Sequence, residues 1–187
     1  RGPLPPHCTF NWPYQTEQWK EIVREEEVTL PAVFWPYLMP PDGSQEALAL
    51  DLLTDILSTG HSSRLYQELV YTKKCASEVA SYIDAREMPG LVWFYAVGNA
   101  PTESLDAIEE SLESVISNVC ENGVTEEELT KAKNKAEMRT AAGRARVTTK
   151  ADHLAHCHIF YNETNRYNTM LGSLQNIKRE DIMDIAR

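Results

Sequence analysis

The sequence predicts an α+β protein built around an antiparallel sheet. Before residue 100, segments rich in β-branched and aromatic residues alternate with helical segments, and after it only helical periodicity remains. Two of the strand-like segments are joined by a short turn. This segregation of strands from helices favours an antiparallel sheet over a doubly wound parallel one. No Gly-rich phosphate-binding loop occurs in the sequence.

The first strand-like region is KEIVREEEVTLPAVFWPYLMP, residues 20–40. It predicts two extended segments, because β-branched and aromatic residues recur in it. Pro31 and Pro36 place these segments at an edge or a bulge, since proline cannot donate a ladder hydrogen bond. The strand-type residues are Val28, Leu30, Val33 and Trp35.

Two helices are predicted next. Ser44 suits the N-cap of the first, and Gly60 suits its C-terminal cap. Its inward-facing residues are Ala47, Leu50, Leu53, Ile56 and Leu57. The second helix is expected over 62–73, where Leu65, Leu69 and Tyr66 recur at helical spacing.

The segments CASEVASYID (75–84) and LVWFYAVGNA (91–100) have strand-type composition, and the turn-prone AREMPG separates them. This arrangement predicts an antiparallel hairpin. The small residues Ala76, Ala80 and Ser81 predict a strand against which a helix packs closely.

The rest of the chain reads as helices. Thr102 is the predicted cap of a helix whose apolar stripe has period 3.6. That stripe is Leu105, Ile108, Leu112, Val115, Ile116 and Val119. Thr125 and Glu128 form a T-x-x-E capping box for the next helix. Further helices are predicted over 148–161 and 164–175, and KREDIMDIAR begins another.

Composition excludes some functions. The formal net charge of −10 argues against a nucleic-acid or anionic-membrane surface, which needs clustered positive charge. No apolar run approaches the ~20 residues that span a bilayer. The N-terminus RGPLPPHCTF has neither an initiator Met nor a signal-peptide pattern, so we interpret the chain as part of a longer protein. Residues 1–18 are expected to be a linker or surface arm, and 19–187 a single domain.

The four cysteines form no C-x-x-C pair and are too sparse for a disulfide framework, so free thiols are expected. They are Cys8, Cys75, Cys120 and Cys157. The sequence HLAHCH places His153, His156 and Cys157 close together on a helix, where they could supply three zinc ligands. The spacing fits no standard zinc motif, so adventitious metal capture is the favoured interpretation and no physiological metal site is predicted.

Catalytic motifs are absent. No histidine begins H-x-x-E-H, the helix motif that supplies two zinc ligands and a general base. A G-x-S-x-G nucleophile elbow is missing as well, and the neighbouring His61 and Ser63 lack an acidic partner. No catalytic residue is therefore predicted in this chain.

Four stretches carry a resemblance: ALDLLTDILSTGHSSRLYQELV, ASEVASY, GVTEEELTKAKN and IKREDIMDIA. Their order and spacing resemble the pitrilysin/insulinase family of zinc metallopeptidases, from about Val28 to the last residue. SSRLYQELV and GVTEEELTKAKN are fairly specific together. They look like the second, non-zinc-binding domain of a bacterial, processing-peptidase-like member.

The resemblance implies a half-shell in which helices cover one side of the antiparallel sheet, with the family's last strand missing. It implies that zinc is held by an H-x-x-E-H-bearing domain or subunit, with which this non-catalytic domain encloses an extended peptide substrate. The chain alone would be inactive, and its parent would be a zinc metalloendopeptidase of the bacterial periplasm or cytoplasm.

The family's second domain often supplies an Arg and a Tyr, seven residues apart, that hold the substrate backbone. The resemblance places these positions at Val70 and Ser77, so the pair is lost. LVYTKKCA resembles a bacterial version of the segment that lacks this Arg, which favours a peptidase parent.

The loop STGHSS corresponds to a Gly-rich substrate-handling loop in the non-catalytic subunit of the mitochondrial processing peptidase. The resemblance therefore makes six residues candidates for substrate contact: Gly60, His61, Ser62, Ser63, Arg64 and Tyr66. Arg64 and Tyr66 also read as anchors on a helix surface.

Two alternatives stay open. One is a structural protein of the same fold, similar to the core subunits of respiratory complexes. The other is a zinc-binding module centred on His153.

Overall fold

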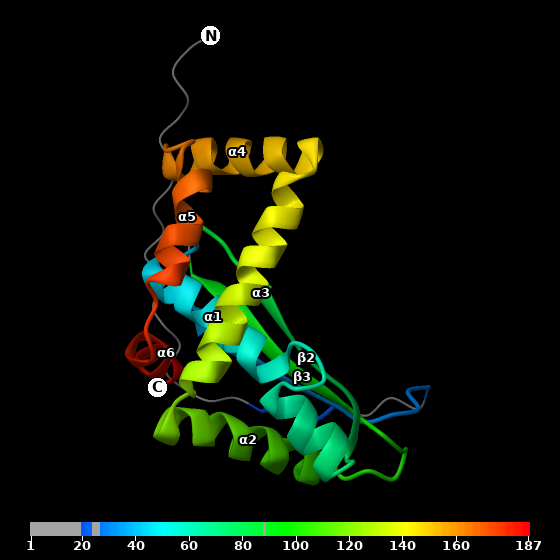
Figure 1. Cartoon of the computed structure of the whole chain (residues 1–187). Helices are drawn as coiled ribbons and strands as arrows, with labels where there is room; N and C mark the ends of the chain where they lie inside the picture. Colours follow the sequence, from blue (N-terminus) through cyan, green and yellow to red (C-terminus); the bar gives the residue numbers. More distant parts are fainter. Residues whose placement is uncertain (1–19, 24–26, 88) are drawn as a thin grey trace.

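The computed structural model describes residues 20–23, 27–87 and 89–187. Within them, three strands and seven helices follow one another along the chain (Figure 1). The elements are β1 (Ala32–Met39), α1 (Gln45–Ser58), the π-helix η1 (Tyr66–Thr72), β2 (Ala76–Asp84), β3 (Gly90–Gly98), α2 (Leu105–Asn122), α3 (Glu126–Arg144), α4 (Val147–Tyr161), α5 (Arg166–Gln175) and α6 (Arg179–Ala186).

The sheet is antiparallel throughout, in the order β1-β3-β2. β3 is central, and the predicted hairpin with β2 is confirmed. The predicted edge position of the Pro-containing strand is also confirmed, because Pro36 lies in the outer strand β1 opposite Trp93. The separate extended segment predicted before Pro31 is wrong, since Val28 and Leu30 lie outside any strand.

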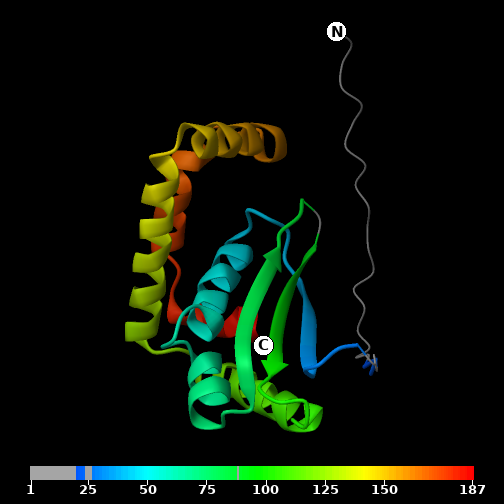
Figure 2. The same ribbon diagram turned by 90° about the vertical axis from the view of Figure 1, so that its right-hand side faces the viewer.

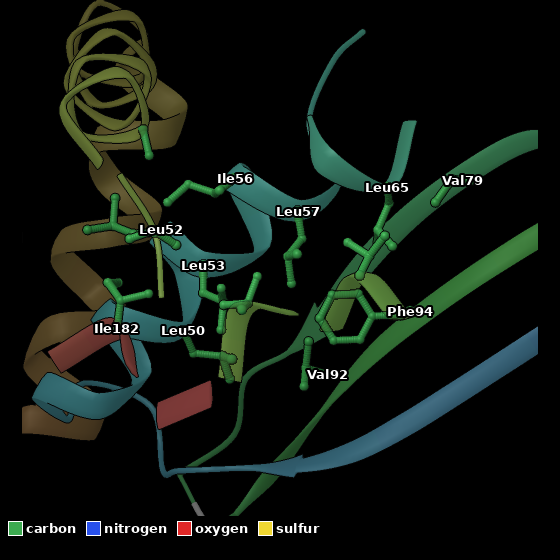
Figure 3. Close-up of a cluster of buried hydrophobic side chains, with 14 of the residues drawn as sticks. Leu50, Leu52, Leu53, Ile56, Leu57, Leu65, Val79, Val92, Phe94 and Ile182 are labelled. Atoms are coloured by element: carbon green, nitrogen blue, oxygen red, sulfur yellow. The ribbon is translucent and has the colours of Figure 1, made fainter. Parts of the chain in front are cut away.

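Helices cover one face of this sheet (Figure 2). Along β3 burial alternates, so that Val92, Phe94 and Ala96 are buried while their neighbours are partly exposed. Figure 3 shows Phe94 and Val92 pointing toward Leu57 of α1 and toward Leu65, in the middle of the core. The predicted fold class, an α+β protein with an antiparallel sheet covered by helices on one side, is confirmed.

Helix α1 forms as its caps predict. Ser44 Oγ accepts a hydrogen bond from the Ala47 amide at 3.0 Å, and Gly60, with φ +88°, follows the C-cap Thr59. A left-handed φ of this kind favours glycine. All five residues predicted to face inward are buried.

The small residues of β2 divide between the two faces of the sheet. Ser81 Oγ lies 2.5 Å from Ser58 Oγ of α1, so α1 packs closely there, as predicted. Ala76 is buried as well. Ala80 is different, because it pairs with Tyr95 on the face away from α1.

The two helices after the sheet are joined tightly. The capping box is confirmed, because the Thr125 and Glu128 side chains each bond the other residue's backbone amide. The N-cap of α2 is Ser104, so the predicted cap at Thr102 is two residues too early. Ile108, the first buried residue of the predicted stripe, belongs to the main core.

The chain from the end of α3 to the start of α5 projects away from the sheet (Figures 1 and 2). We call α4 and α5 together the limb. Cys157 is the single buried residue of α4, and it lies outside the main hydrophobic cluster. Leu174 at the end of α5 rejoins that cluster, and Ile182 of α6 packs beside α1 (Figure 3).

Two further findings concern the described residues. Cys75, Cys120 and Cys157 are free thiols, as predicted, whereas Cys8 lies outside the described part. In the same described part, no helix is long and apolar enough to cross a membrane. The predicted arm at residues 1–18 also lies outside the described residues.

Candidate substrate-contact surface

The loop between α1 and η1 holds the predicted contact residues from Gly60 to Arg64, and Tyr66 begins η1. Gly60, His61 and Ser62 are exposed, whereas Ser63 is buried and its Oγ makes no hydrogen bond. The His61 ring meets the Tyr66 ring edge to face, with centroids 4.6 Å apart. The structure therefore brings His61 and Tyr66 together at the surface and turns Ser63 inward.

Lysines of α3 hold this loop in place. Lys135 Nζ donates to the Thr59 carbonyl at 2.7 Å, and Lys131 Nζ contacts Ser62 Oγ. From the first turn of η1, Gln67 Nε2 donates to the His61 carbonyl at 2.5 Å. The first half of the loop is thus held by side chains of α3 and η1.

Arg64 has the geometry of an anchor. Its Nε and a terminal nitrogen donate to the two carboxylate oxygens of Glu128 at 2.7 and 2.8 Å. The same guanidinium donates to Asn118 Oδ1 at 3.2 Å and to the Gly123 carbonyl at 3.1 Å. These four hydrogen bonds use most of the five N–H groups of the guanidinium, so its main role here is structural.

This anchor also changes the acidity of Glu128. The hydrogen bonds from Arg64 are the largest cause that lowers the pKa of Glu128 to about 2, and burial opposes them. The backbone and side chain of Thr125 act in the same direction as Arg64. The carboxylate is therefore charged throughout the neutral range.

The junction of η1 and β2 has an irregular backbone. Residues 66–72 form a π-helix instead of the predicted α-helix, and Lys73 N bonds the Glu68 carbonyl at 2.8 Å. Lys74 follows with φ +54°, and the β2–β3 register shifts between Ala76 and Glu78. Irregular backbone of this kind persists only where surrounding contacts maintain it. It is found more often at functional sites than elsewhere.

The two positions at which the resemblance predicts the family's Arg and Tyr lie at this junction. Val70 is half-buried in η1, and Ser77 is exposed at the register shift. Ser77 Oγ donates to the Gly98 carbonyl at 3.1 Å. Tyr71, beside Val70, is 71% exposed and is a surface aromatic that the sequence analysis did not single out.

The second face of the sheet carries a group of aromatic residues, which we call the aromatic face. The Phe34 and Tyr95 rings stack at 5.8 Å, and Tyr82 extends the group across β2. Phe34 and Tyr82 are 60% and 64% exposed. Sequence reasoning missed this face, although alternation in β1 and β3 carried the signal, because aromatic residues occur on both sides of these strands.

A polar contact orients this face. The Tyr95 hydroxyl donates to Glu78 Oε1 at 2.9 Å, and this hydrogen bond is the largest cause that raises the pKa of Tyr95. The Tyr95 ring is therefore held in its stacked position beside Phe34, and its hydroxyl remains protonated. The aromatic face offers flat apolar surface with a carboxylate beside it.

The two edges of the sheet differ. β1 contains Pro36, whereas β2 contains no proline between Ala76 and Asp84. An outer strand without proline presents backbone N–H and C=O groups that can pair with another extended chain. In the described part of the chain, β2 has β3 as its sheet neighbour.

The predicted adventitious metal ligands have separate partners. The His153 ring stacks on Tyr167, and His156 Nε2 lies 3.1 Å from Asp42 Oδ2. Among the described residues, no group of three or more His, Cys, Asp or Glu side chains has an arrangement that could hold a metal ion. The hypothesis of a zinc-binding module centred on His153 finds no support in this geometry.

Comparison with known proteins identifies the family. A family model described as the Peptidase M16 inactive domain matches residues 3–136. The zinc protease PqqE of Helicobacter pylori is 30% identical over 112 residues, which are 60% of this chain and 25% of that protein. A zinc protease of Streptomyces coelicolor is 25% identical over 139 residues. These are 74% of this chain and 30% of the Streptomyces protein. The chain thus spans less than a third of these curated relatives.

Solved structures share the fold. A protease from Helicobacter pylori superposes with a TM-score of 0.79 at 23% identity, over 88% of this chain and 39% of that one. An inactive peptidase domain from Bordetella parapertussis superposes with a TM-score of 0.75 at 24% identity, over 88% and 87% of the two chains. Since the M16 inactive-domain model matches more than half of the sequence, the chain belongs to the M16 peptidases, the pitrilysin/insulinase family that it resembles, as one of their inactive domains.

Proposed function

We propose that this inactive domain forms one wall of a chamber that encloses an extended peptide, while the zinc site lies on an H-x-x-E-H-bearing domain or subunit. The observation that carries the proposal is the aromatic face. The helices bury one side of the sheet and leave Phe34 and Tyr82 exposed on the other. Exposed apolar surface of this kind marks a binding surface.

An extended peptide fits this surface for two reasons. Strand addition at the proline-free edge of β2 would satisfy the peptide backbone, and pockets beside the strand would select its side chains. The aromatic face supplies apolar contacts next to that edge. The exposed loop residues Gly60, His61 and Ser62, with Tyr66, are the proposed further contacts at the α1–η1 end of the sheet.

Water activation is assigned to the partner. Zinc peptidase chemistry needs a metal with an open coordination position and a nearby general base. The described side chains do not gather such a ligand set, so this chain's proposed part is to hold peptide and to exclude bulk water. No residue of the chain is given a catalytic role.

The experiment reconstitutes the complex. This chain is mixed with the H-x-x-E-H-bearing domain of its own protein, and cleavage of a peptide library is measured with and without chelator. Chelator-sensitive cleavage that depends on both components is expected. A stable complex that cleaves no peptide would overturn the proposal and support the alternative of a structural subunit.

Variants locate the peptide surface. Replacing both exposed aromatics, Phe34→Ser with Tyr82→Ser, should raise KM by about tenfold, the effect of losing ~1.4 kcal/mol of binding. The matched control replaces exposed apolar residues of α4, Val147→Ser with Ile159→Ser, and should leave KM unchanged. Equal effects of the two pairs would contradict the assignment of the peptide to the aromatic face.

A further inference from the structure

A cleft lies between the limb and the sheet, away from the aromatic face. It has a volume of about 360 Å³ and lies between the β1–α1 loop, the β2–β3 turn and the end of α4. Its lining includes Asp42 from the loop, Arg86 and Glu87 from the turn, and His156, Phe160 and Tyr161 from α4. This volume can hold one amino-acid side chain.

The cleft includes the Asp42 side chain, which, among the described residues, no salt bridge joins to a lysine or arginine. Asp42 Oδ2 accepts a hydrogen bond from the Tyr161 hydroxyl at 2.5 Å and lies 3.1 Å from His156 Nε2. Burial, then the hydrogen bond to Asp42, raises the pKa of Tyr161, so Tyr161 remains a neutral donor. Arg86 is bound to Asp84, to which its Nε donates at 3.0 Å.

Aromatic rings line the same space. The Phe160 ring is 44% exposed and lies 4.6 Å from the His156 ring. Beside the cleft, the Arg166 guanidinium lies 4.3 Å from the centre of the Tyr161 ring and donates to the Gly43 carbonyl. This corner of the fold thus already binds one guanidinium group between a ring and an oxygen, a favourable cation–π arrangement.

We propose that the cleft binds the cationic side chain, arginine or lysine, of a polypeptide. Asp42 would pair with the cation while Phe160 covers its flat side. The formal net charge of −10 would attract such a ligand from a distance. That the ligand is a polypeptide rests on the proposed function, whereas the affinity of the cleft for the cation does not.

The test uses the 187-residue chain and ¹⁵N NMR. N-acetyl-arginine amide is titrated in, with N-acetyl-citrulline amide as the neutral probe of the same shape. Saturable shifts are expected at the amides of 42–43, 85–87 and 156–161, with Kd on the order of 1 mM for so small a ligand. Citrulline should shift them little. Equal shifts with both probes, or unsaturated shifts spread over the acidic surface, would overturn the proposal.

Two variants and a control sharpen the test. Asp42→Asn should weaken arginine binding about tenfold, since it removes the charge partner. Phe160→Leu should weaken it about threefold, the loss of one partly exposed cation–π contact. Asp152→Asn, on the exposed side of α4, should leave it unchanged.

Circular dichroism and thermal unfolding of each variant check the fold. If Asp42→Asn is unfolded, Phe160→Leu decides, and unchanged binding in a folded variant overturns the proposal. The zinc domain takes no part, so failure here leaves the chamber proposal standing.

Discussion

Glu128 shows how one side chain can serve two structural purposes. It caps α3 through Thr125 and holds the Arg64 guanidinium, which in turn bonds the carbonyl of Gly123 at the α2–α3 joint. Both side chains are less than one-third exposed, at 29% for Glu128 and 21% for Arg64. The pair therefore ties the α1–η1 loop to the two helices that follow the sheet.

The lowered pKa of Glu128 predicts a pH dependence. Its folded pKa of about 2 lies below the ordinary 4.5, so its stabilisation is fully present above pH 4.5 and is lost as the pH falls through about 2. Glu128→Gln should lower the free energy of unfolding by about 1–2 kcal/mol at pH 7, allowing for solvent screening, and by progressively less below pH 4.5.

Urea unfolding at several pH values measures this difference. Glu127→Gln, one residue earlier in the same helical turn, is the matched control and should change little. A Glu128→Gln deficit that stays constant down to pH 2 would show that the charge of Glu128 is unimportant.

A second charged group joins α1 to α3. Arg139 donates to Asp51 Oδ2 at 3.0 Å and to Asp55 Oδ1 at 3.1 Å, and the two acids lie one helical turn apart. Burial is the largest cause that raises the pKa of Asp51, while Arg139 opposes it. A raised folded pKa means that this carboxyl favours folding most when protonated, and that its contribution falls as the pH rises.

Arg139→Met should therefore destabilise the protein most at neutral pH. We expect a loss of about 1–3 kcal/mol at pH 7, where Asp51 and Asp55 lose their shared cation, and a smaller loss as the pH falls and Asp51, whose pKa burial raises, takes up a proton. Unfolding at pH 7 and pH 4 measures it, with the exposed Arg146→Met as control. A larger loss at pH 4 than at pH 7 would refute the explanation.

At the scale of elements, the sequence correctly predicted features that depend on residues close together in the chain, such as helix N-termini. Ser44 and the Thr125–Glu128 box marked helix starts correctly, because a side chain close in sequence satisfies the first amide groups. η1 was predicted as an ordinary α-helix, because Leu65 and Leu69 fit either helix type. The apolar spacing carries no signal for the wider hydrogen bonding seen in η1, such as the bond from Lys73 N to the Glu68 carbonyl.

The candidate site could be predicted only in part. The exposed positions of the α1–η1 loop follow from its Gly and Ser content, but the inward turn of Ser63 does not. The role of Arg64 depended on Glu128, 64 residues away. The aromatic face required knowledge of which side of each strand the helices cover.

The α2–α3 joint provides an element-scale prediction. Gly123 has φ +70°, and a Cβ there would lie 2.8 Å from Met183 Sδ of α6. Gly123→Ala should cost about 1–2 kcal/mol of unfolding free energy, because an L-residue is strained in this conformation. Gly172→Ala in α5, with no atom within 4 Å of its added Cβ, should be neutral or stabilising. Thermal unfolding of both variants measures the difference. Equal unfolding midpoints would contradict the claim that the α2–α3 joint requires glycine at position 123.

At the scale of the whole molecule, stability is unevenly distributed. α1, the sheet, α2 and α6 share one hydrophobic cluster, whereas α4 contributes none of its members. Contacts of the limb with the β1–α1 loop include the hydrogen bond from Tyr161 to Asp42 and the bond from Arg166 to the Gly43 carbonyl. Partly exposed polar contacts of this type give less protection than a buried core.

Hydrogen exchange should reveal this division. The amides of α4 are expected to exchange at least about tenfold faster than those of β3 and α1, the ratio for an opening free energy lower by ~1.4 kcal/mol. Mass spectrometry of peptides from each element measures the rates. Equal protection in α4 and β3 would mean that the limb unfolds only with the core.

The bare aromatic face also governs how the isolated polypeptide behaves at high concentration. Mutual repulsion between copies carrying a charge of −10 keeps these rings apart at neutral pH and low ionic strength. Added salt shortens the range of that repulsion, and acidification toward the isoelectric point of about 5.0 removes it. Under either condition, we expect the exposed Phe34 and Tyr82 of one copy to associate with those of another. Aggregation measured against salt concentration and pH therefore reports on this exposed apolar surface.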